Sequence, residues 1–235
     1  MMIKIEQFRQ MKIIDLTMPV SERMPVFPGH VRLKFRVTHR FEDYGYFVTA
    51  MEMSCHTGTH IDAPYHIYDK GRGESPYMKF YEIPLDRLIG EAICFEIPKG
   101  ETEGVSVEDL ERAEKNFGEV RRGDIVIIHT GWDERMDEDA FYNRHPYITQ
   151  GSAEWLVKRG IKLLCTDIID IDNPLTGETE HWPTHRTMFR NNVIVIENHI
   201  NLSKIAGKRV YYIALPLKLV TVPDGCPVRA IALLK

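Results

Sequence analysis

Apolar segments of strand length recur along the whole chain, and they constrain its fold more than any other feature. The early segments often alternate apolar with other residues, whereas the later ones are almost continuously apolar. Continuously apolar strands are typical of a sheet that is covered on both faces. The segments lie at 11–17, 31–39, 46–54, 89–97, 124–130, 161–167, 193–198, 210–217 and 228–234. Together they predict a well-buried central sheet.

Helical signals are fewer than strand signals. The clearest covers 106–118, where Ser106 can cap the first turn and Asp109 stands at the capping-box distance. A second helix is expected over 152–159, and a third candidate lies near 183–190, where a proline could occupy the first turn. Strands and helices together predict an α/β protein.

The overall composition is that of a globular protein, with 43% hydrophobic and 27% charged residues and a net charge of −4. Its Lys and Arg residues are dispersed, so it lacks the basic stripe that nucleic-acid binding normally requires. The first residues form neither a signal peptide nor a membrane anchor, and the four cysteines lack the spacing of a zinc knuckle or redox motif. We therefore expect one cytoplasmic domain, residues 1–235, that acts on a small molecule and binds neither nucleic acid nor membrane.

The densest chemical signal surrounds Gly58, where His56, His60, Asp62 and His66 stand close together. The Thr-Gly-Thr sequence between the first two histidines disfavours a helix. A tight turn at Gly58 could instead fold these two imidazoles toward each other. His60 and Asp62, two residues apart in an extended chain, would point to the same side. These three groups could share a cation.

Pro64 stiffens the chain before His66, which would hold this imidazole at a fixed offset suited to acid/base chemistry. A ligand set of nitrogen and oxygen fits Zn²⁺, Mn²⁺ or Fe²⁺ better than Ca²⁺ or Mg²⁺, and Zn²⁺ and Mn²⁺ are the leading candidates. Two other interpretations remain open. In the first, the histidines cap turns and bind no metal. In the second, they form a closed structural zinc site, although such sites are commonly rich in cysteine and Cys55 is the only thiol nearby in the sequence.

The segment His56-Thr-Gly58-Thr59-His60-Ile-Asp62-Ala-Pro64-Tyr-His66 resembles the HxGTHxDxPxH signature of the putative cyclase family, which includes bacterial kynurenine formamidases and isatin hydrolases. The resemblance extends over roughly residues 12–235, through MPVFPGH, HTGW, VIVIEN, IALPLKL and DGCPVRAIAL. It implies a mixed central sheet curling toward a barrel with peripheral helices, of the swivelling β/β/α type. It also implies one or two divalent ions per chain and a homo-oligomer, either a dimer or a tetramer.

The resemblance further implies roles for single residues. The implied metal ligands are His56, His60, Asp62, His185 and Glu197, with Asp62 able to bridge two ions and Glu197 as a further bridging carboxylate. His66 would be the catalytic acid/base. Glu197 at the end of an apolar strand would be unusual without a cation, because a buried carboxylate needs a partner. Phe27 stands where kynurenine formamidases carry a substrate-stacking tryptophan, so it would keep an aromatic wall.

Other candidate residues have weaker signals. His129 ends an apolar strand, where core packing and substrate contact are both open. We assign surface or loop roles to His30, His39, His145, His181 and His199. Asp167, Asp170 and Asp172 follow a buried strand, and we expect them to cap a loop, with the support of a metal ligand as the alternative. The aromatic and Met residues near 41–53 are interpreted as core or pocket wall.

Three functions remain as hypotheses. The first is hydrolysis of a small amide, formamide or lactam by metal-activated water, with His66 as the proton-transfer group. The second keeps the metal and changes the reaction to cyclisation, dehydration or lactone opening. The third is a metal-stabilised binding protein without turnover, which predicts no pocket beside the metal. A covalent nucleophile is disfavoured, because no serine occupies a GxSxG motif.

Overall fold

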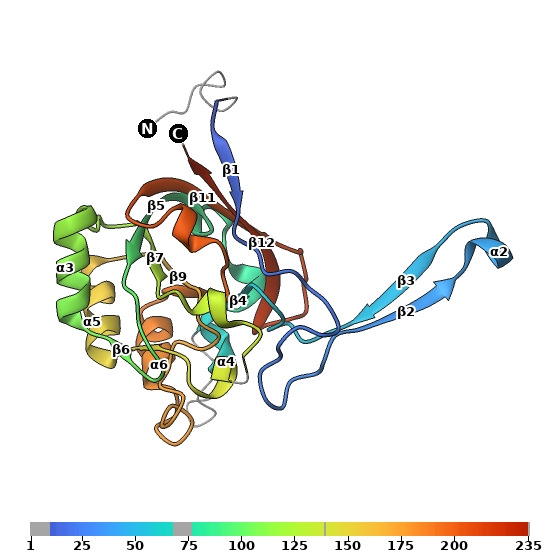
Figure 1. Ribbon diagram of the computed structural model, residues 1–235, viewed down its shortest axis with the longest axis horizontal. Coiled ribbons are helices and arrows are strands. Elements are labelled where there is room, and N and C mark those ends of the chain that lie inside the picture. The colour runs from blue at the N-terminus through green and yellow to red at the C-terminus, as the bar shows by residue number, and fades with distance from the viewer. Residues whose placement is uncertain (1–9, 68–76, 139, 235) are drawn as a thin grey trace.

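Eight strands form one mixed sheet that closes into a barrel (Figure 1). The computed structural model of the chain describes residues 10–67, 77–138 and 140–234. The strands of this sheet are β1 (Lys12–Asp15), β4 (His60–Asp62), β5 (Ile89–Glu96), β7 (Ile125–His129), β9 (Leu163–Thr166), β10 (Ile194–Glu197), β11 (Arg209–Pro216) and β12 (Gly225–Leu234). They are ordered β1-β12-β11-β5-β7-β9-β10-β4, and a further pairing of β4 with β12 closes the ring. The expected sheet curling to a barrel is confirmed.

The parallel strands explain why the later apolar segments are continuous. β5, β7, β9 and β10 are parallel neighbours, whereas β4, β11 and β12 complete the ring with antiparallel pairings. Successive residues of β7 pack into two different hydrophobic cores, one on each face of the sheet. Ile125 and Ile127 pack with the other barrel strands, whereas Val126 and Ile128 pack with residues of the covering helices. Since both faces are buried, the strand has no position for a solvated polar side chain.

Three longer helices cover one outer side of the barrel, namely α3 (Val107–Phe117), α5 (Gln150–Arg159) and α6 (Pro183–Arg190) (Figure 1). The expected capping box is present, because Ser106 Oγ accepts from the Asp109 N–H and the Asp109 carboxylate accepts from the Ser106 N–H. The second helix begins earlier than expected, since Thr149 caps it by accepting from the Ser152 N–H. Within the described ranges, no helix is long and apolar enough to cross a membrane.

The remaining elements are short. They are the paired strands β6 (Gly104–Val105) and β8 (Tyr147–Ile148), the helix α4 (Ala140–Asn143), and the 3-10 turns η1 (Pro64–His66), η3 (Phe80–Glu82), η4 (Leu85–Arg87), η5 (Trp132–Arg135) and η6 (Leu202–Lys204). Of these, η1 carries the last histidine of the Gly58 segment.

The strands β2 (Lys34–His39) and β3 (Val48–Glu52) do not join the barrel. They pair with each other in a hairpin, tipped by α2 (Phe41–Tyr44), that projects far from the body (Figure 1). The expectation that residues near 41–53 form core or pocket wall is therefore wrong, since Phe41 is 62% and Phe47 61% exposed. The alternating pattern correctly predicted strands with one apolar face, but it does not say what covers that face.

Candidate metal centre

The Gly58 segment folds as a tight turn that leads into β4. Gly58 has φ of 63°, a left-handed conformation that glycine adopts without strain. β4 then pairs with β10, which places His60 directly opposite Glu197 on the same face of the sheet. On the other side of β4, a Cβ at Gly225 would lie 2.8 Å from His56 Cε1 and 2.6 Å from the Ile61 carbonyl oxygen. Only a glycine there lets the His56 ring lie against β12.

The structure brings the five expected ligands together around Asp62. His56 Nδ1 lies 2.6 Å from Asp62 Oδ1, and His60 Nε2 lies 3.2 Å from the same oxygen. The other oxygen, Oδ2, is 3.6 Å from His185 Nε2. Glu197 completes the cluster, with Oε2 3.7 Å from His60 Nε2 and Oε1 3.4 Å from His185 Nε2. Asp62 therefore faces different histidines with its two oxygens.

Each of these three imidazoles is oriented through the nitrogen that does not point at the cluster centre. The oriented nitrogens are His60 Nδ1 at 2.9 Å from the Gly58 carbonyl oxygen, His185 Nδ1 at 2.6 Å from Asp172, and His56 Nε2 at 3.1 Å from Asp224. An acceptor behind a histidine fixes which nitrogen carries the proton, and leaves the other free to bind a metal. Sequence reasoning missed Asp224, which lies in the DGCP motif far along the chain. Asp172 has both of the roles considered for it. It supports the imidazole of His185, and it caps the first turn of α6 by accepting a hydrogen bond from the Thr184 N–H.

The electrostatics of the cluster favour a bound cation. Burial lowers the pKa of His56, but the adjacent carboxylates of Asp62 and Asp224 outweigh it and raise that pKa to about 10. Burial and the charge of Asp62 raise the pKa of Glu197 to about 7. His185 Nε2 is buried and has no hydrogen-bond partner among the described residues. Buried carboxylates and an unpartnered imidazole nitrogen facing one point fit a divalent ion.

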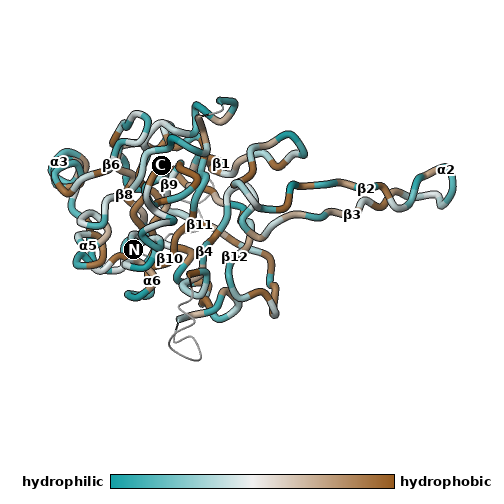
Figure 2. The backbone as a smooth tube through the Cα atoms, turned by 90° about the horizontal axis from the view of Figure 1, so that it is seen from below, coloured by the Kyte–Doolittle hydropathy of each residue, from teal (hydrophilic) through white to brown (hydrophobic). Residues whose placement is uncertain are grey.

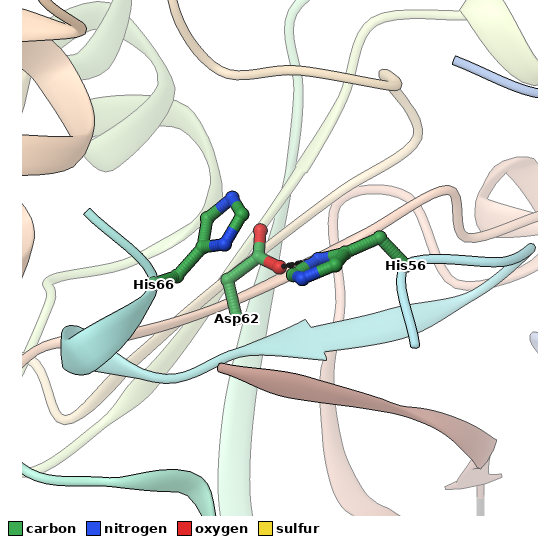
Figure 3. A group of neighbouring side chains, drawn as sticks. All are labelled: His56, Asp62 and His66. Carbon is green, nitrogen blue, oxygen red and sulfur yellow. Dashed lines mark hydrogen bonds and ion pairs between the residues drawn. The ribbon is translucent and has the colours of Figure 1, made fainter. Parts of the chain in front are cut away.

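His66 lies beside the cluster and carries no charge at neutral pH. Its ring centre is 4.1 Å from that of His56 and 6.3 Å from that of His185. Figure 3 shows the His66 and His56 imidazoles on opposite sides of the Asp62 carboxylate. Burial lowers the pKa of His66 to about 3, and the neighbouring histidines add to the shift despite Asp62. A neutral imidazole at this place can accept a proton.

A pocket of about 300 Å³ opens onto the cluster. Beyond the cluster itself, its walls include Phe27, His30, Ile67, Ile169, Trp182 and Arg186. Phe27 lies in the pocket as expected, but sequence reasoning missed Trp182 and Arg186. His30, which was assigned a surface or loop role, does lie in a loop, but its ring lines the pocket between those of Phe27 and His56, with ring centres 5.3 and 5.7 Å away. The quoted MPVFPGH motif, which ends in His30, was the available signal.

Two further histidines are buried rather than exposed. His199 is fully buried, with Nδ1 3.0 Å from the Thr166 carbonyl oxygen and Nε2 2.7 Å from the Tyr212 hydroxyl. His145 is also buried, with Nδ1 2.7 Å from the carbonyl oxygen of Pro146. A surface role is therefore wrong for both, although both lie in connecting segments outside the helices and strands, as a loop role requires. Exposed His181 fits its assigned loop role.

The His129 and Asp167 side chains lie in the core and do not line the pocket. Asp167 accepts hydrogen bonds from the backbone N–H groups of Thr130, Gly131 and Trp132. This is the loop-capping role expected for it. For His129 the structure favours core packing over substrate contact.

Several known proteins are similar to this chain in sequence or in fold. The model of the family described as putative cyclase matches residues 14–173. A kynurenine formamidase of Geobacillus thermodenitrificans is 30% identical over 219 residues, covering 92% of this chain and 95% of the relative. The structure of isatin hydrolase A from Ralstonia solanacearum has a TM-score of 0.85 at 24% identity, and the match covers 97% of this chain and 93% of that one. The structure of a predicted metal-dependent hydrolase from Bacillus stearothermophilus has a TM-score of 0.75 at 28% identity, and the match covers 96% of this chain and 99% of that one.

Proposed function

Because this chain belongs to the putative cyclase family, we propose that it is a metal-dependent hydrolase of a small amide, formamide or lactam. The observation that carries this proposal is a pocket that ends at three oriented imidazoles and two buried carboxylates. The relatives named kynurenine formamidase support a non-peptide C–N bond as the target. A binding protein without turnover predicts no pocket beside the metal, and the pocket of about 300 Å³ argues against it.

The proposed ligands are the five residues of the cluster. The two oxygens of Asp62 face different partners, so we infer that Asp62 would reach two ion positions. His56 and His60 would hold one position and His185 the other, and Glu197, whose two oxygens face His60 and His185, would reach both. The nitrogen and oxygen donors favour Zn²⁺ or Mn²⁺. When bound, such an ion polarises the substrate carbonyl and lowers the pKa of a water molecule.

We propose that His66 moves the proton in this reaction. Its uncharged ring can take a proton from the attacking water and pass it to the leaving nitrogen, which keeps the leaving group neutral. Phe27 would pack against an apolar or aromatic part of the substrate and exclude water from the carbonyl. Arg186 adds a positive charge to the pocket wall, which favours a substrate with an acidic group.

The test is His66→Ala in metal-loaded protein, assayed against aryl formamides, isatin-like lactams and lactones. We expect metal content at the wild-type level and turnover lower by roughly 10²–10⁴, the usual contribution of a general acid/base. His181→Ala, which alters an exposed histidine, is the matched control and should change neither quantity. Unchanged turnover in the His66 variant would remove this residue from the mechanism, and activity on lactones alone would contradict C–N bond hydrolysis.

The remaining expectations concern the whole protein. The four cysteines are free, as is typical of the cytoplasm, and we propose that the enzyme acts there on a small molecule. The dimer or tetramer expected from the resemblance stays a prediction.

A further inference from the structure

A second group of potential metal ligands lies outside the cluster around Asp62. His129, Asp133 and Asp167 each offer an imidazole nitrogen or a carboxylate oxygen, and these atoms all lie within 4.8 Å of one another. None of these three residues, all of them in the described ranges, lines the pocket that opens onto the Asp62 cluster. The reaction proposed above uses none of them, so their arrangement needs an explanation of its own.

The fold brings the three side chains to one edge of the barrel sheet. His129 is the last residue of β7, and Asp167 directly follows β9, its parallel neighbour. Ligand sites of parallel sheets are commonly built where neighbouring strands end in this way. Asp133 reaches the same edge from η5, where its Oδ2 accepts a hydrogen bond from the Asn201 N–H at 2.9 Å. The strands themselves are apolar, and Figure 2 shows hydrophobic segments in the body around β9.

The polar atoms that face one another in this group are not satisfied by hydrogen bonds. Both ring nitrogens of His129 and the Oδ1 atom of Asp133 are buried without a hydrogen-bond partner among the described residues. His129 Nε2 lies 3.8 Å from Asp133 Oδ1, and the two side chains are only 8% and 9% exposed. This separation is too long for a hydrogen bond. Since buried polar atoms are nearly always partnered, we infer that a further group binds between these two.

The charges of the group favour a cation over a water molecule. Asp133 and Asp167 are carboxylates, and within the described part of the chain no Lys or Arg forms an ion pair with either. Burial and the charge of Asp167 raise the pKa of Asp133 to about 6, which shows how poorly its charge is compensated. A water molecule would leave that charge buried and uncompensated, whereas a cation would neutralise it.

The spacing also suits an ion shared by two ligands. Ligand atoms that lie about 2.1 Å from the same ion are about 3.4 Å apart at a tetrahedral angle, and up to about 4.2 Å apart at wider angles. The 3.8 Å between His129 Nε2 and Asp133 Oδ1 falls in this range. We propose that these two atoms bind a divalent transition-metal ion at a site separate from the Asp62 cluster. Their imidazole and carboxylate donors fit Zn²⁺ or Mn²⁺.

Asp167 would contribute its charge to this ion rather than a free ligand atom. It already accepts hydrogen bonds from the backbone N–H groups of the three residues between His129 and Asp133. The ion would therefore join the end of β7 to η5 and face the segment that follows β9. That segment continues to Ile169 and Asp170, which line the pocket. The site would thus stabilise a wall of the pocket without touching the substrate.

The experiment counts the zinc ions bound to the full chain by equilibrium dialysis and metal analysis. Asp133→Asn keeps the shape of the side chain and an acceptor for the Asn201 N–H, but removes the charged ligand. His129→Gln removes the imidazole and keeps a polar side chain. Glu134→Gln, which neutralises an exposed carboxylate at the next position, is the matched control. Circular dichroism reports whether each variant is folded.

We expect the Asp133 and His129 variants each to bind one Zn²⁺ per chain fewer than the wild type and the Glu134 control. Crystals of the zinc-loaded wild type should show an anomalous peak about 2.0–2.2 Å from His129 Nε2 and Asp133 Oδ1. Equal zinc counts in all four proteins would overturn the proposal, and so would a water molecule alone at this place in the zinc-loaded crystal. If the variants do not fold, the wild-type crystal decides. The expected difference of one ion holds whether or not the Asp62 cluster fills, so a failure of the hydrolase proposal would be distinguished from a failure of this one.

Discussion

Filling the metal centre near neutral pH should release protons, because the nitrogens that would hold the ion are protonated in the metal-free chain. The pKa of His56 is raised to about 10, since Asp62 and Asp224 outweigh its burial. The pKa of His185 is also raised, as Asp172, Asp62 and Glu197 together outweigh burial. Both imidazoles therefore carry a proton in the metal-free protein and must lose it when a cation takes its place.

The magnitude follows from these protonation states. At about pH 7.5, His56, with a pKa of about 10, and His185, whose pKa is raised well above its usual range, each contribute close to one proton. Glu197, with a pKa of about 7, contributes about 0.2. We therefore expect about 2 protons per chain when both positions fill, and more if water ionises at the ion. Metal ions and protons compete for the same nitrogen and oxygen atoms. The apparent affinity for metal should rise with pH, by roughly 100-fold per unit between about pH 6 and 8.

The assay is calorimetric titration of chelator-treated protein with Zn²⁺ or Mn²⁺ in buffers of different ionisation enthalpy. The slope of the observed heat against that enthalpy gives the number of protons released. Asp224→Asn removes one of the carboxylates that raise the pKa of His56, so this variant should release fewer protons. Release of less than about half a proton by the wild type would refute the charge assignment of the cluster.

Two further predictions concern stability. The pKa of His199 is about 4 because burial disfavours its charged form, so the unfolded chain takes up the proton first as the pH falls below about 6.5. His199 should therefore contribute a loss of up to about 3 kcal/mol in the free energy of unfolding between about pH 6.5 and pH 4. In urea titrations His199→Gln should lose less stability than the wild type by that amount, although His66 still destabilises both proteins as the pH falls. Equal losses in both proteins would contradict this reasoning. Gly225→Ala should cost about 1–3 kcal/mol and weaken metal binding, since its Cβ would lie 2.6 Å from the Ile61 carbonyl oxygen. Gly151→Ala, whose Cβ would meet Val107 Cγ2 at 3.5 Å, is the control, and equal effects of the two changes would contradict this reasoning.

Local signals predicted the parts of the fold that local interactions determine. The capping box at Ser106, the start of α6 at Pro183 and the turn at Gly58 depend on neighbours within a few residues, and all are present. The continuous apolar segments became the parallel strands of the barrel. Alternation at 31–39 and 46–54 also predicted strands correctly, but placed them in the wrong sheet, because periodicity describes a face and not its partner.

The site was predictable where a short motif carries it. His56, His60, Asp62 and His66 are close in sequence, and β4 keeps them close in space. Asp224 could not be found in this way, because it meets His56 only when β12 pairs with β4 and closes the barrel. The same holds for the pocket walls, which come from loops brought together by the packing of α6 and the segment before β2.

The most direct test of the proposed metal centre is anomalous scattering from crystals of the metal-loaded protein, recorded at the zinc and manganese absorption edges. We predict one or two anomalous peaks per chain at this centre, each in contact with Asp62, and with His56, His60, His185 and Glu197 as the other protein ligands. Anomalous peaks elsewhere in the chain, apart from one at His129 and Asp133, would contradict the account. So would the absence of a peak beside Asp62 in crystals grown from protein that carries a full complement of metal in solution.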